Sequence, residues 1–331
     1  MSAKYSRIIS TGSALPAARI TNEDLARRLA ADGIETSDEW IRTRTGIEAR
    51  RFVNGTTETT TTLAAAAAQK ALEGGGVDPK TIDLIIVETT TPDQVFPATA
   101  AAVQRLFGAA VCAAFDVQAV CAGFIYALNA ADAMLRAGPY QRALVIGAET
   151  MSRVIDMKDR ATCVLFGDGA GAVVLEASAK PGILAARMYA DGSYDENVLG
   201  LTARIDHGEL CGRPYINMDG RQVFKLAVDG LTSSAQEVAV LAGVDPQDED
   251  VYIPHQANLR IMTMVAKKLG IPDERMIKTV SEQGNTSAAS VPLALDVAVR
   301  SGKISDGSLV LLQAVGAGMA WGSAIVRWRS E

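Results

Sequence analysis

The sequence predicts an α/β fold built from two copies of one unit. Short runs rich in β-branched residues alternate with alanine-rich segments that have helical spacing of apolar positions. A block of residues in the first half recurs 167 positions later. The length of 331 residues also exceeds the roughly 250–300 at which one hydrophobic core stops growing. We therefore expect two similar halves, residues 1–178 and residues 179–331.

The strands are expected where short apolar runs end at turn residues. The candidates are residues 7–11, 84–88, 114–117, 143–147, 173–175, 251–253, 309–313 and 323–327. Helices fill the intervals, and a long central helix in each half is expected to end at Gly138 and at Gly302. Residues 14–58 and 194–220 have no counterpart in the other half. We interpret them as insertions, where specificity usually lies.

The repeat is clearest in two short blocks. Residues 76–79 (Gly-Val-Asp-Pro) followed by Asp83 match residues 243–246 followed by Asp250. An Ala-Gln pair in the preceding helix, at 68–69 and 235–236, keeps the same offset, and an apolar strand follows each block.

Two further comparisons point to residues that carry chemistry. At the same offset His255 pairs with Glu88, and counting back 17 residues from Gly138 and Gly302 pairs Cys121 with Asn285. Two like α/β units packed about a pseudo-twofold axis bring equivalent loop ends together. The repeat therefore predicts that Cys121, His255 and Asn285 share one cavity.

Cys121 follows the strand at 114–117 and precedes a helix whose apolar positions step by three and four residues. At a helix N-terminus the unpaired amides and the macrodipole favour a thiolate, the nucleophilic form of cysteine. A cysteine in an apolar context is usually an inert packing residue. We give that interpretation to Cys112, Cys163 and Cys211, and single out Cys121 for its predicted neighbours.

His255 and Asn285 are weak candidates separately, since a histidine at a strand end is often structural and Gly-Asn-Thr-Ser is ordinary turn sequence. Together they offer two donors to one thioester oxygen, which would stabilise an enolate or oxyanion. A papain-like hydrolase, in which Asn orients His as a base, is the alternative for a Cys-His-Asn set. The pairing of Asn285 with Cys121 in the repeat argues against it.

Two glycine-rich segments resemble loops that bind ligands. Residues 166–172 lack the spacing of a dinucleotide fingerprint and precede a strand rather than a helix, so we expect a close-packed turn. Residues 315–322 are expected to form a turn between strands whose backbone amides could complete an oxyanion hole.

A helix beginning near Asn258 places Arg260, Lys267 and Lys268 along one side. Such a row is either a solvated face or a docking patch for an acidic carrier protein or a nucleotide phosphate.

Composition excludes several classes of function. A net charge of −6 argues against non-specific nucleic-acid binding. Four cysteines without CxxC spacing and two histidines indicate neither a disulfide scaffold nor a metal centre. No apolar run reaches the roughly 18–20 residues of a membrane span, and the start lacks a signal-peptide pattern. We expect a soluble, cytoplasmic protein without a membrane segment.

Five motifs in this order resemble β-ketoacyl-acyl-carrier-protein synthase III of the thiolase superfamily, over about residues 7–328. They are Asp38-Glu39-Trp40-Ile41 with Arg44-Thr45-Gly46-Ile47, Ala119-Val120-Cys121-Ala122-Gly123-Phe124, Phe166-Gly167-Asp168-Gly169-Ala170-Gly171, His255-Gln256-Ala257-Asn258-Leu259-Arg260, and Gly284-Asn285-Thr286-Ser287-Ala288-Ala289-Ser290. The resemblance implies a thiolase-like, five-layered αβαβα fold of two duplicated halves, and a homodimer.

By this resemblance Cys121 takes an acyl group from acyl-CoA, while His255 and Asn285 bind the thioester carbonyl of malonyl-acyl carrier protein during its decarboxylation. The carbanion attacks the acyl-Cys121 thioester, and the backbone amides of Cys121 and Ala317 hold the resulting oxyanion. The implied reaction initiates type II fatty-acid synthesis, releases CO₂ and CoA, and uses no metal or other cofactor.

The resemblance also assigns binding residues. Trp40 and Arg160 match a pair that sandwiches the adenine of CoA. Further CoA contacts are expected at Arg44, Asn258 and Arg260, carrier-protein docking at Lys225, Arg260, Lys267 and Lys268, and acyl-pocket positions at Phe96, Val315 and Met319. Phe96 is expected to reach into the partner subunit's pocket.

Three departures from the family's pattern leave the acyl starter open. Gln283 stands where the family commonly has His, Arg221 where Asn is frequent, and residues 315–321 read Val-Gly-Ala-Gly-Met-Ala-Trp instead of Phe-Gly-Gly-Gly-Phe-Thr-Trp. The alternatives are a secondary-metabolite condensing or acyl-transfer enzyme with the same three residues, and a non-catalytic protein that binds CoA or a carrier.

Overall fold

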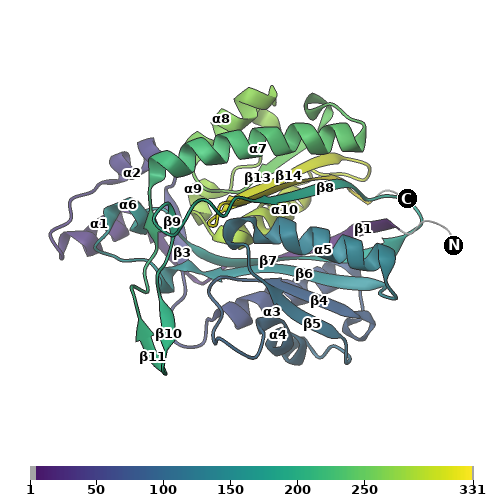
Figure 1. Cartoon of the computed structure of the whole chain (residues 1–331), viewed down its shortest axis with the longest axis horizontal. Helices are drawn as coiled ribbons and strands as arrows, with labels where there is room; N and C mark the ends of the chain where they lie inside the picture. Colours follow the sequence, from purple (N-terminus) through teal and green to yellow (C-terminus); the bar gives the residue numbers. More distant parts are fainter. Residues whose placement is uncertain (1–4, 330–331) are drawn as a thin grey trace.

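The computed structural model describes residues 5–329, which fold into five layers, confirming the predicted α-β-α-β-α architecture (Figure 1). One outer layer contains α3 (Thr60–Gly75) and α4 (Thr99–Phe107). The first sheet has the order β1 (Tyr5–Ala14), β7 (Asp168–Ser178), β6 (Arg142–Thr150), β4 (Leu84–Glu88), β5 (Ala113–Val117). The central layer contains α5 (Gly123–Ala137) and α10 (Ser290–Arg300).

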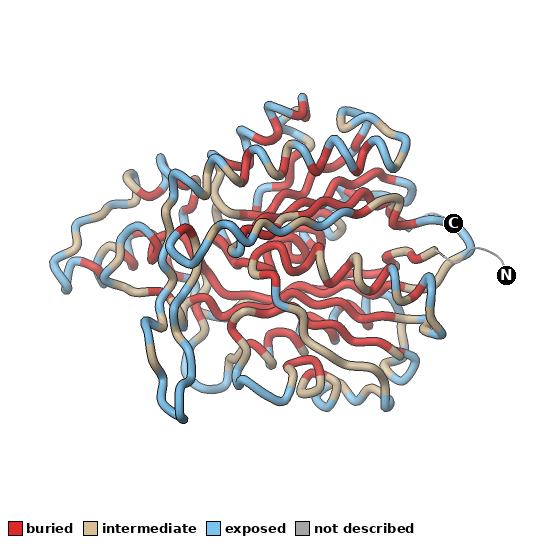
Figure 2. Tube along the Cα trace, in the orientation of Figure 1, coloured by how far each residue is buried: buried red, intermediate tan, exposed pale blue. Residues whose placement is uncertain are grey.

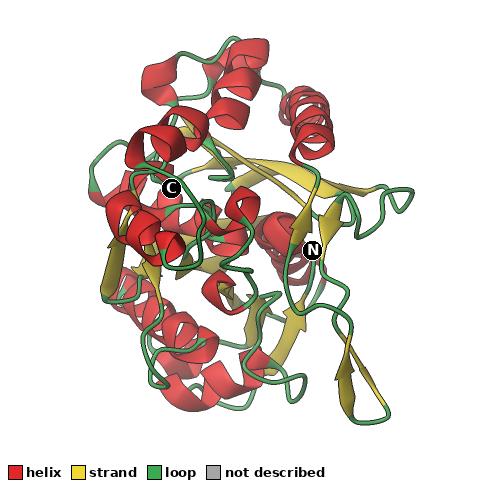
Figure 3. Ribbon diagram, turned by 90° about the vertical axis from the view of Figure 1, so that its left-hand side faces the viewer, coloured by secondary structure: helices red, strands yellow, loops and turns green. Residues whose placement is uncertain are grey.

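The second half supplies the other two layers. Its sheet has the order β13 (Val251–Pro254), β14 (Leu309–Gly316), β15 (Ala320–Arg327), β8 (Ile183–Ala190). The outer helices α7 (Gly220–Ala242) and α8 (Leu259–Leu269) cover it. Figure 3 shows the helices of the outer layers on either side of the two sheets.

The two sheets share one pattern of pairing. The pair β4–β6 is parallel with Leu84 opposite Ala143, and the pair β13–β14 is parallel with Val251 opposite Val310. Both positions therefore keep the offset of 167. The second sheet has four strands where the first has five, and beside β13 there is only an isolated bridge between Tyr252 and Met276.

The repeated Gly-Val-Asp-Pro sequence has the same structural role in both halves. Gly76 and Gly243 end α3 and α7 in the left-handed conformation, with φ of 60° and 70°. Asp78 and Asp245 then accept backbone N–H groups at the start of the next 3₁₀ turn. Glycine is favoured at a C-cap in the left-handed conformation, and aspartate is favoured at an N-cap because its side chain accepts backbone N–H groups. These two preferences explain why the same residue types recur.

The insertions form the left end of the molecule in Figure 1. The first contains β2 (Ala18–Thr21), α1 (Asn22–Ala30), α2 (Asp38–Thr45) and β3 (Ala49–Phe52). The second contains β9 (Leu199–Gly200), the projecting hairpin of β10 (Arg204–Asp206) and β11 (Glu209–Cys211), and β12 (Asn217–Met218). The short helices α6 (Arg160–Cys163) and α9 (Val280–Gln283) lie before β7 and before Asn285.

The core runs through the sheets and the central layer (Figure 2). Phe124 and Leu128 on α5 are fully buried, as are Leu293 and Ala298 on α10. Sheets on both sides bury these two helices, so their apolar residues are not confined to one narrow stripe. Within residues 5–329, no helix combines the length and apolar character needed to cross a bilayer.

The glycine-rich segment at 166–172 is not the predicted turn, because β7 begins at Asp168. The reason is close packing between the sheet and α10. A Cβ atom at Gly171 would lie 2.6 Å from the backbone nitrogen of Leu293, so only glycine allows the helix to approach the strand.

The predicted pairing of Cys121 with Asn285 is also wrong. The 3₁₀ turns η2 (Val120–Ala122) and η6 (Ser287–Ala289) lead into α5 and α10, and each begins with a left-handed residue. The offset of 167 thus continues here, and it pairs Cys121 with Ala288. Counting back from Gly138 and Gly302 failed because α5 has 15 residues and α10 has 11.

Candidate active site

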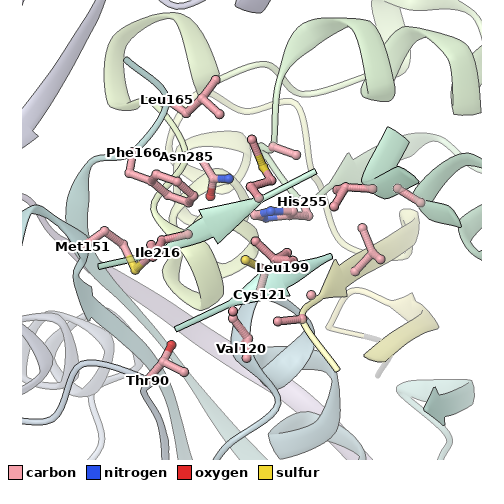
Figure 4. A pocket seen from close by; sticks show the side chains of 18 of the residues that line it. Thr90, Val120, Cys121, Met151, Leu165, Phe166, Leu199, Ile216, His255 and Asn285 are labelled. Carbon is pink, nitrogen blue, oxygen red and sulfur yellow. The ribbon is translucent and has the colours of Figure 1, made fainter. Parts of the chain in front are cut away.

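A cavity of about 390 Å³ opens between the two halves, and Cys121, His255 and Asn285 all line it. Figure 4 shows these three side chains directed into the same space. The structure therefore brings together three residues that span 164 positions of the chain, as the repeat predicted, although the detailed pairing behind that prediction was wrong.

Cys121 lies in η2, immediately before α5, and its side chain is buried. The end of β14 packs directly on this turn. A Cβ atom at Gly316 would lie 2.7 Å from the backbone nitrogen of Cys121 and 3.0 Å from the carbonyl oxygen of Ala119. Because Gly316 packs on the backbone of Cys121, the next residue, Ala317, begins the turn between β14 and β15 close to that backbone. Ala317 also lines the cavity.

The expectation that the helix N-terminus makes Cys121 a thiolate is wrong for the protein without substrate. The pKa of the Cys121 thiol is raised to about 12, first by burial and then by the carboxyl groups of Glu149 and Glu88, against a hydrogen bond to Ser287 that lowers it. Cys121 is therefore a thiol in the free protein, and it would have to lose this proton to act as a nucleophile.

Asn285 is fixed by its backbone and by its side chain. Its N–H donates to the carbonyl of Leu165 at 2.8 Å, and its own carbonyl accepts the N–H of Gly167 at 2.9 Å. The glycine-rich segment therefore holds this asparagine in place. The side-chain Oδ1 accepts the N–H of Ser287 at 2.8 Å, which leaves the Nδ2 group as the donor available to a ligand.

His255 directly follows β13, and its backbone N–H donates to the carbonyl of Gln313 at 2.7 Å. Its Nδ1 atom is 2.6 Å from the hydroxyl oxygen of Ser290, which also accepts the N–H of Gln256. Burial lowers the pKa of His255 to about 3, so the imidazole is neutral at physiological pH. With the Ser290 hydroxyl donating to Nδ1, the proton is on Nε2 and that atom becomes a hydrogen-bond donor.

The cavity wall combines the predicted pocket residues with the second insertion. Val315 and Met319 line the cavity, as do Leu199, Leu201, Ile216 and Met218. Phe96 does not line the cavity of its own chain, and 81% of its surface is exposed. Its predicted entry into a partner subunit's pocket stays a prediction.

The residues predicted to bind CoA lie in two places. Asn258 lines the cavity and caps α8 by accepting the N–H of Ile261. Trp40 has the guanidinium carbons of Arg44 and Arg160 over its ring, at 4.5 and 4.4 Å from the ring centroid. An adenine ring between Trp40 and Arg160 would require the arginine to move away.

The predicted docking residues are exposed on the outer layer of the second half. Lys225 is on α7, and Arg260, Lys267 and Lys268 are on α8. Lys268 pairs with Asp229 of α7 at 3.1 Å, which joins the two helices at the surface.

Sequence reasoning missed Ser287 and Ser290, which hydrogen-bond to the predicted residues, and Glu149, which accepts a hydrogen bond from Ser287. The offset of 167 pairs residues 120 and 123 with residues 287 and 290, so a comparison of the two halves carried on to these positions would have found the two serines. Glu149 lies beyond the strand predicted at 143–147, within the longer β6 of the structure, and nothing in the local sequence distinguishes it. Over the described part of the chain, no cluster of three or more His, Cys, Asp or Glu residues could hold a metal ion.

Comparisons with known proteins match this chain along most of its length. Residues 115–192 match the family model of 3-oxoacyl-[acyl-carrier-protein] synthase III, and residues 240–328 match the model of its C-terminal part. The crystal structure of 3-oxoacyl-[acyl-carrier-protein] synthase III from Aquifex aeolicus is similar with 46% identity and a TM-score of 0.90, over 98% of this chain and 100% of that one.

Two further structures are similar at 37% identity. One is 3-oxoacyl-(acyl carrier protein) synthase III from Pseudomonas aeruginosa, with a TM-score of 0.90 and 98% of each chain covered. The other is the priming β-ketosynthase of the R1128 polyketide biosynthetic pathway, with a TM-score of 0.92 over 98% of this chain and 97% of that one.

Proposed function

The chain belongs to the 3-oxoacyl-[acyl-carrier-protein] synthase III family, and from this premise we propose how its cavity carries out the reaction. It is a condensing enzyme of the acyltransferase type. We propose that it joins an acyl-CoA starter to malonyl-acyl carrier protein, giving 3-oxoacyl-carrier protein, CO₂ and CoA. The single observation that carries the proposal is the convergence of Cys121, His255 and Asn285 on one cavity.

Cys121 is the proposed nucleophile of the first half-reaction. Its sulfur attacks the thioester carbon of acyl-CoA, and the tetrahedral intermediate expels CoA and leaves an acyl-Cys121 thioester. The backbone N–H groups of Cys121 and Ala317 are the proposed donors to the oxyanion. Donors fixed by the backbone need no reorganisation when the charge develops.

His255 and Asn285 are the proposed donors of the second half-reaction. Loss of CO₂ from the malonyl group leaves an enolate, whose charge on the thioester oxygen needs hydrogen-bond donors instead of a strong base. A neutral imidazole with its proton on Nε2 and an amide Nδ2 group meet that need. The carbanion then attacks acyl-Cys121 and forms the carbon–carbon bond.

The remaining expectations belong to the same proposal. Acyl-CoA is a substrate, and the reaction needs no metal or redox cofactor because decarboxylation supplies the bonding electrons. The exposed basic residues Lys225, Arg260, Lys267 and Lys268 are the proposed docking surface for the carrier protein. We also propose a cytoplasmic homodimer in which Phe96 enters the partner's cavity.

A second candidate, a condensing enzyme that starts a secondary metabolite, is favoured by one observation. The polyketide priming β-ketosynthase and the Pseudomonas synthase share the same 37% identity with this chain. Panels of acyl-CoA starters and of carrier proteins would separate the two candidates.

The proposal is tested by incubating the enzyme with acyl-CoAs, reading its intact mass, then adding malonyl-acyl carrier protein. We expect one acyl group on the wild type and none on Cys121→Ser. Asn285→Ala should acylate normally but condense roughly 10²–10³-fold more slowly, the usual cost of one oxyanion donor. Equal acylation of Cys121→Ser and wild type would refute the nucleophile. Ester hydrolysis without decarboxylation would indicate a hydrolase, and binding without acylation a non-catalytic protein.

A further inference from the structure

A chain of hydrogen bonds leads from the nucleophile away from the cavity. The Cys121 thiol donates to the hydroxyl oxygen of Ser287 at 3.4 Å, and that hydroxyl donates to Oε1 of Glu149 at 3.1 Å. All three residues are buried. The thiol proton thus points along a path that ends at a carboxylate.

The environment of Glu149 suits a proton acceptor. The hydroxyl groups of Thr90, Thr91 and Ser287 donate to its carboxylate, as do the backbone N–H groups of Thr90 and Thr91. These donors support an ionised carboxylate in the interior. Burial nevertheless raises the pKa of Glu149 above its usual value, which makes it a stronger base than an exposed glutamate.

The backbone at both ends of the first hydrogen bond is strained. Val120, directly before Cys121, has φ of 51°, and its counterpart Ser287 has φ of 50°. A left-handed conformation costs a non-glycine residue about 1–2 kcal/mol. The two strained turns lie at equivalent ends of the central helices, and together they bring the thiol and the hydroxyl into contact.

His255 is less well placed to take this proton. Its Nδ1 atom is engaged with Ser290, and its Nε2 atom is needed as a donor in the second half-reaction. The titratable groups that face Glu149 and its surroundings are Glu88 on β4, Asp116 on β5 and Cys121 itself.

We propose that Ser287 and Glu149 form a proton relay that deprotonates Cys121 as it attacks acyl-CoA. This inference rests on the proposed function, because it assumes that Cys121 is the nucleophile. As the sulfur–acyl bond forms, the thiol proton moves to the Ser287 oxygen and the Ser287 proton moves to Oε1 of Glu149. When the bond between the acyl carbon and CoA breaks, the proton returns through Ser287 to the CoA thiolate. No proton is gained or lost.

The test measures the rate of Cys121 acylation in a single turnover, by intact mass, as a function of pH. For the wild type we expect a constant rate at neutral and alkaline pH and a fall at acidic pH, where Glu149 becomes protonated. Ser287→Ala should be roughly 10²–10⁴-fold slower at neutral pH, the range of general acid–base effects. Its rate should rise about tenfold per pH unit, because the thiol must then ionise to water.

Two further variants separate the relay from other effects. Glu149→Gln removes a negative charge that raises the pKa of Cys121, so electrostatics alone predicts faster acylation, whereas the relay predicts slower acylation. Ser234→Ala, a buried serine bonded to Ser323, is the matched control and should acylate like the wild type.

Failure of the relay and failure of the proposed function give different results. Ser287→Ala keeps the backbone N–H that orients Asn285, so it should still decarboxylate malonyl-acyl carrier protein if it is folded. A Ser287→Ala enzyme whose rate has the same pH dependence as the wild type would overturn the relay. A wild-type enzyme that is never acylated would instead overturn the proposed function.

Discussion

Gly316→Ala should separate the geometry of the nucleophile from the stability of the fold. The new methyl group would lie 2.7 Å from the backbone nitrogen of Cys121 and 3.0 Å from the nitrogen of Ala122. Ordinary contact begins at about 3.4 Å, so the turn that holds the sulfur must move by about 0.7 Å. The colliding atoms belong to the backbone, so no side chain can rotate away to relieve the contact.

Two effects of different size should follow. Overpacking of this kind typically costs about 1–3 kcal/mol of stability, which a domain of this length should tolerate. Misplacing a reacting group by nearly 1 Å can cost about 10²-fold in rate. We therefore expect a folded Gly316→Ala enzyme in which the single-turnover rate of Cys121 acylation falls roughly ten- to a hundredfold.

Rapid-quench mass spectrometry measures the acylation rate, and thermal unfolding measures the loss of stability. Gly192→Ala is the control, because a Cβ atom there meets nothing within 4 Å and the backbone needs no left-handed conformation. Acylation of Gly316→Ala within twofold of the wild type would refute the claim that β14 positions the nucleophile.

Two other predictions concern the surface and the stability of the fold. Changing Lys267 and Lys268 to Glu together should raise the KM for the carrier protein roughly two- to tenfold in steady-state assays and leave the KM for acyl-CoA unchanged. Lys80→Glu, on the opposite outer layer, is the control and should change neither KM. An unchanged KM for the carrier protein would count against docking on α8. Burial raises the pKa of Glu249 to about 8, so the folded state keeps a proton that the unfolded state loses above about 4.5. The stability that this carboxyl contributes at acidic pH is therefore lost as the pH rises to about 8. Urea unfolding should find that the stability advantage of Glu249→Gln over the wild type grows across this range, and a constant difference would contradict the assignment.

Most of the fold was predictable because local pattern and long-range packing agree. The strand predicted at 84–88 has the same bounds in the structure. The strand predicted at 309–313 begins at the predicted residue and continues to Gly316. Both begin with four consecutive apolar residues, as expected for strands covered on both faces. The edge strand β8 was missed because its sequence, Ile-Leu-Ala-Ala-Arg-Met-Tyr-Ala, has one β-branched residue and three alanines, which are depleted in strands.

The errors in the site have a common physical origin. Counting from helix ends paired Cys121 with Asn285, yet the length of a surface-ending helix can vary without disturbing the core. Counting from buried features, such as the register of β4 on β6 or the left-handed residues at 120 and 287, keeps the offset of 167. In a duplicated fold, equivalent residues are therefore best identified from buried strands and strained turns, because a one-residue shift there would disturb the packing of the sheet or the turn.

The ionisation of Cys121 shows why sequence position alone could not give the chemistry. A helix N-terminus typically stabilises a negative charge by about 0.3–1 kcal/mol, and by up to about 2 kcal/mol in favourable cases. The rise in the thiol's pKa from 9.0 to about 12 corresponds to roughly 4 kcal/mol in the opposite direction, and it comes first from burial. Burial depends on how both halves and the second insertion close over the cavity, which no local motif encodes. A nucleophilic thiol that folding makes less acidic needs a proton acceptor, and in the proposed relay the two halves supply it together, with Ser287 from the second half bonded to Cys121 and Glu149 from the first half bonded to Ser287.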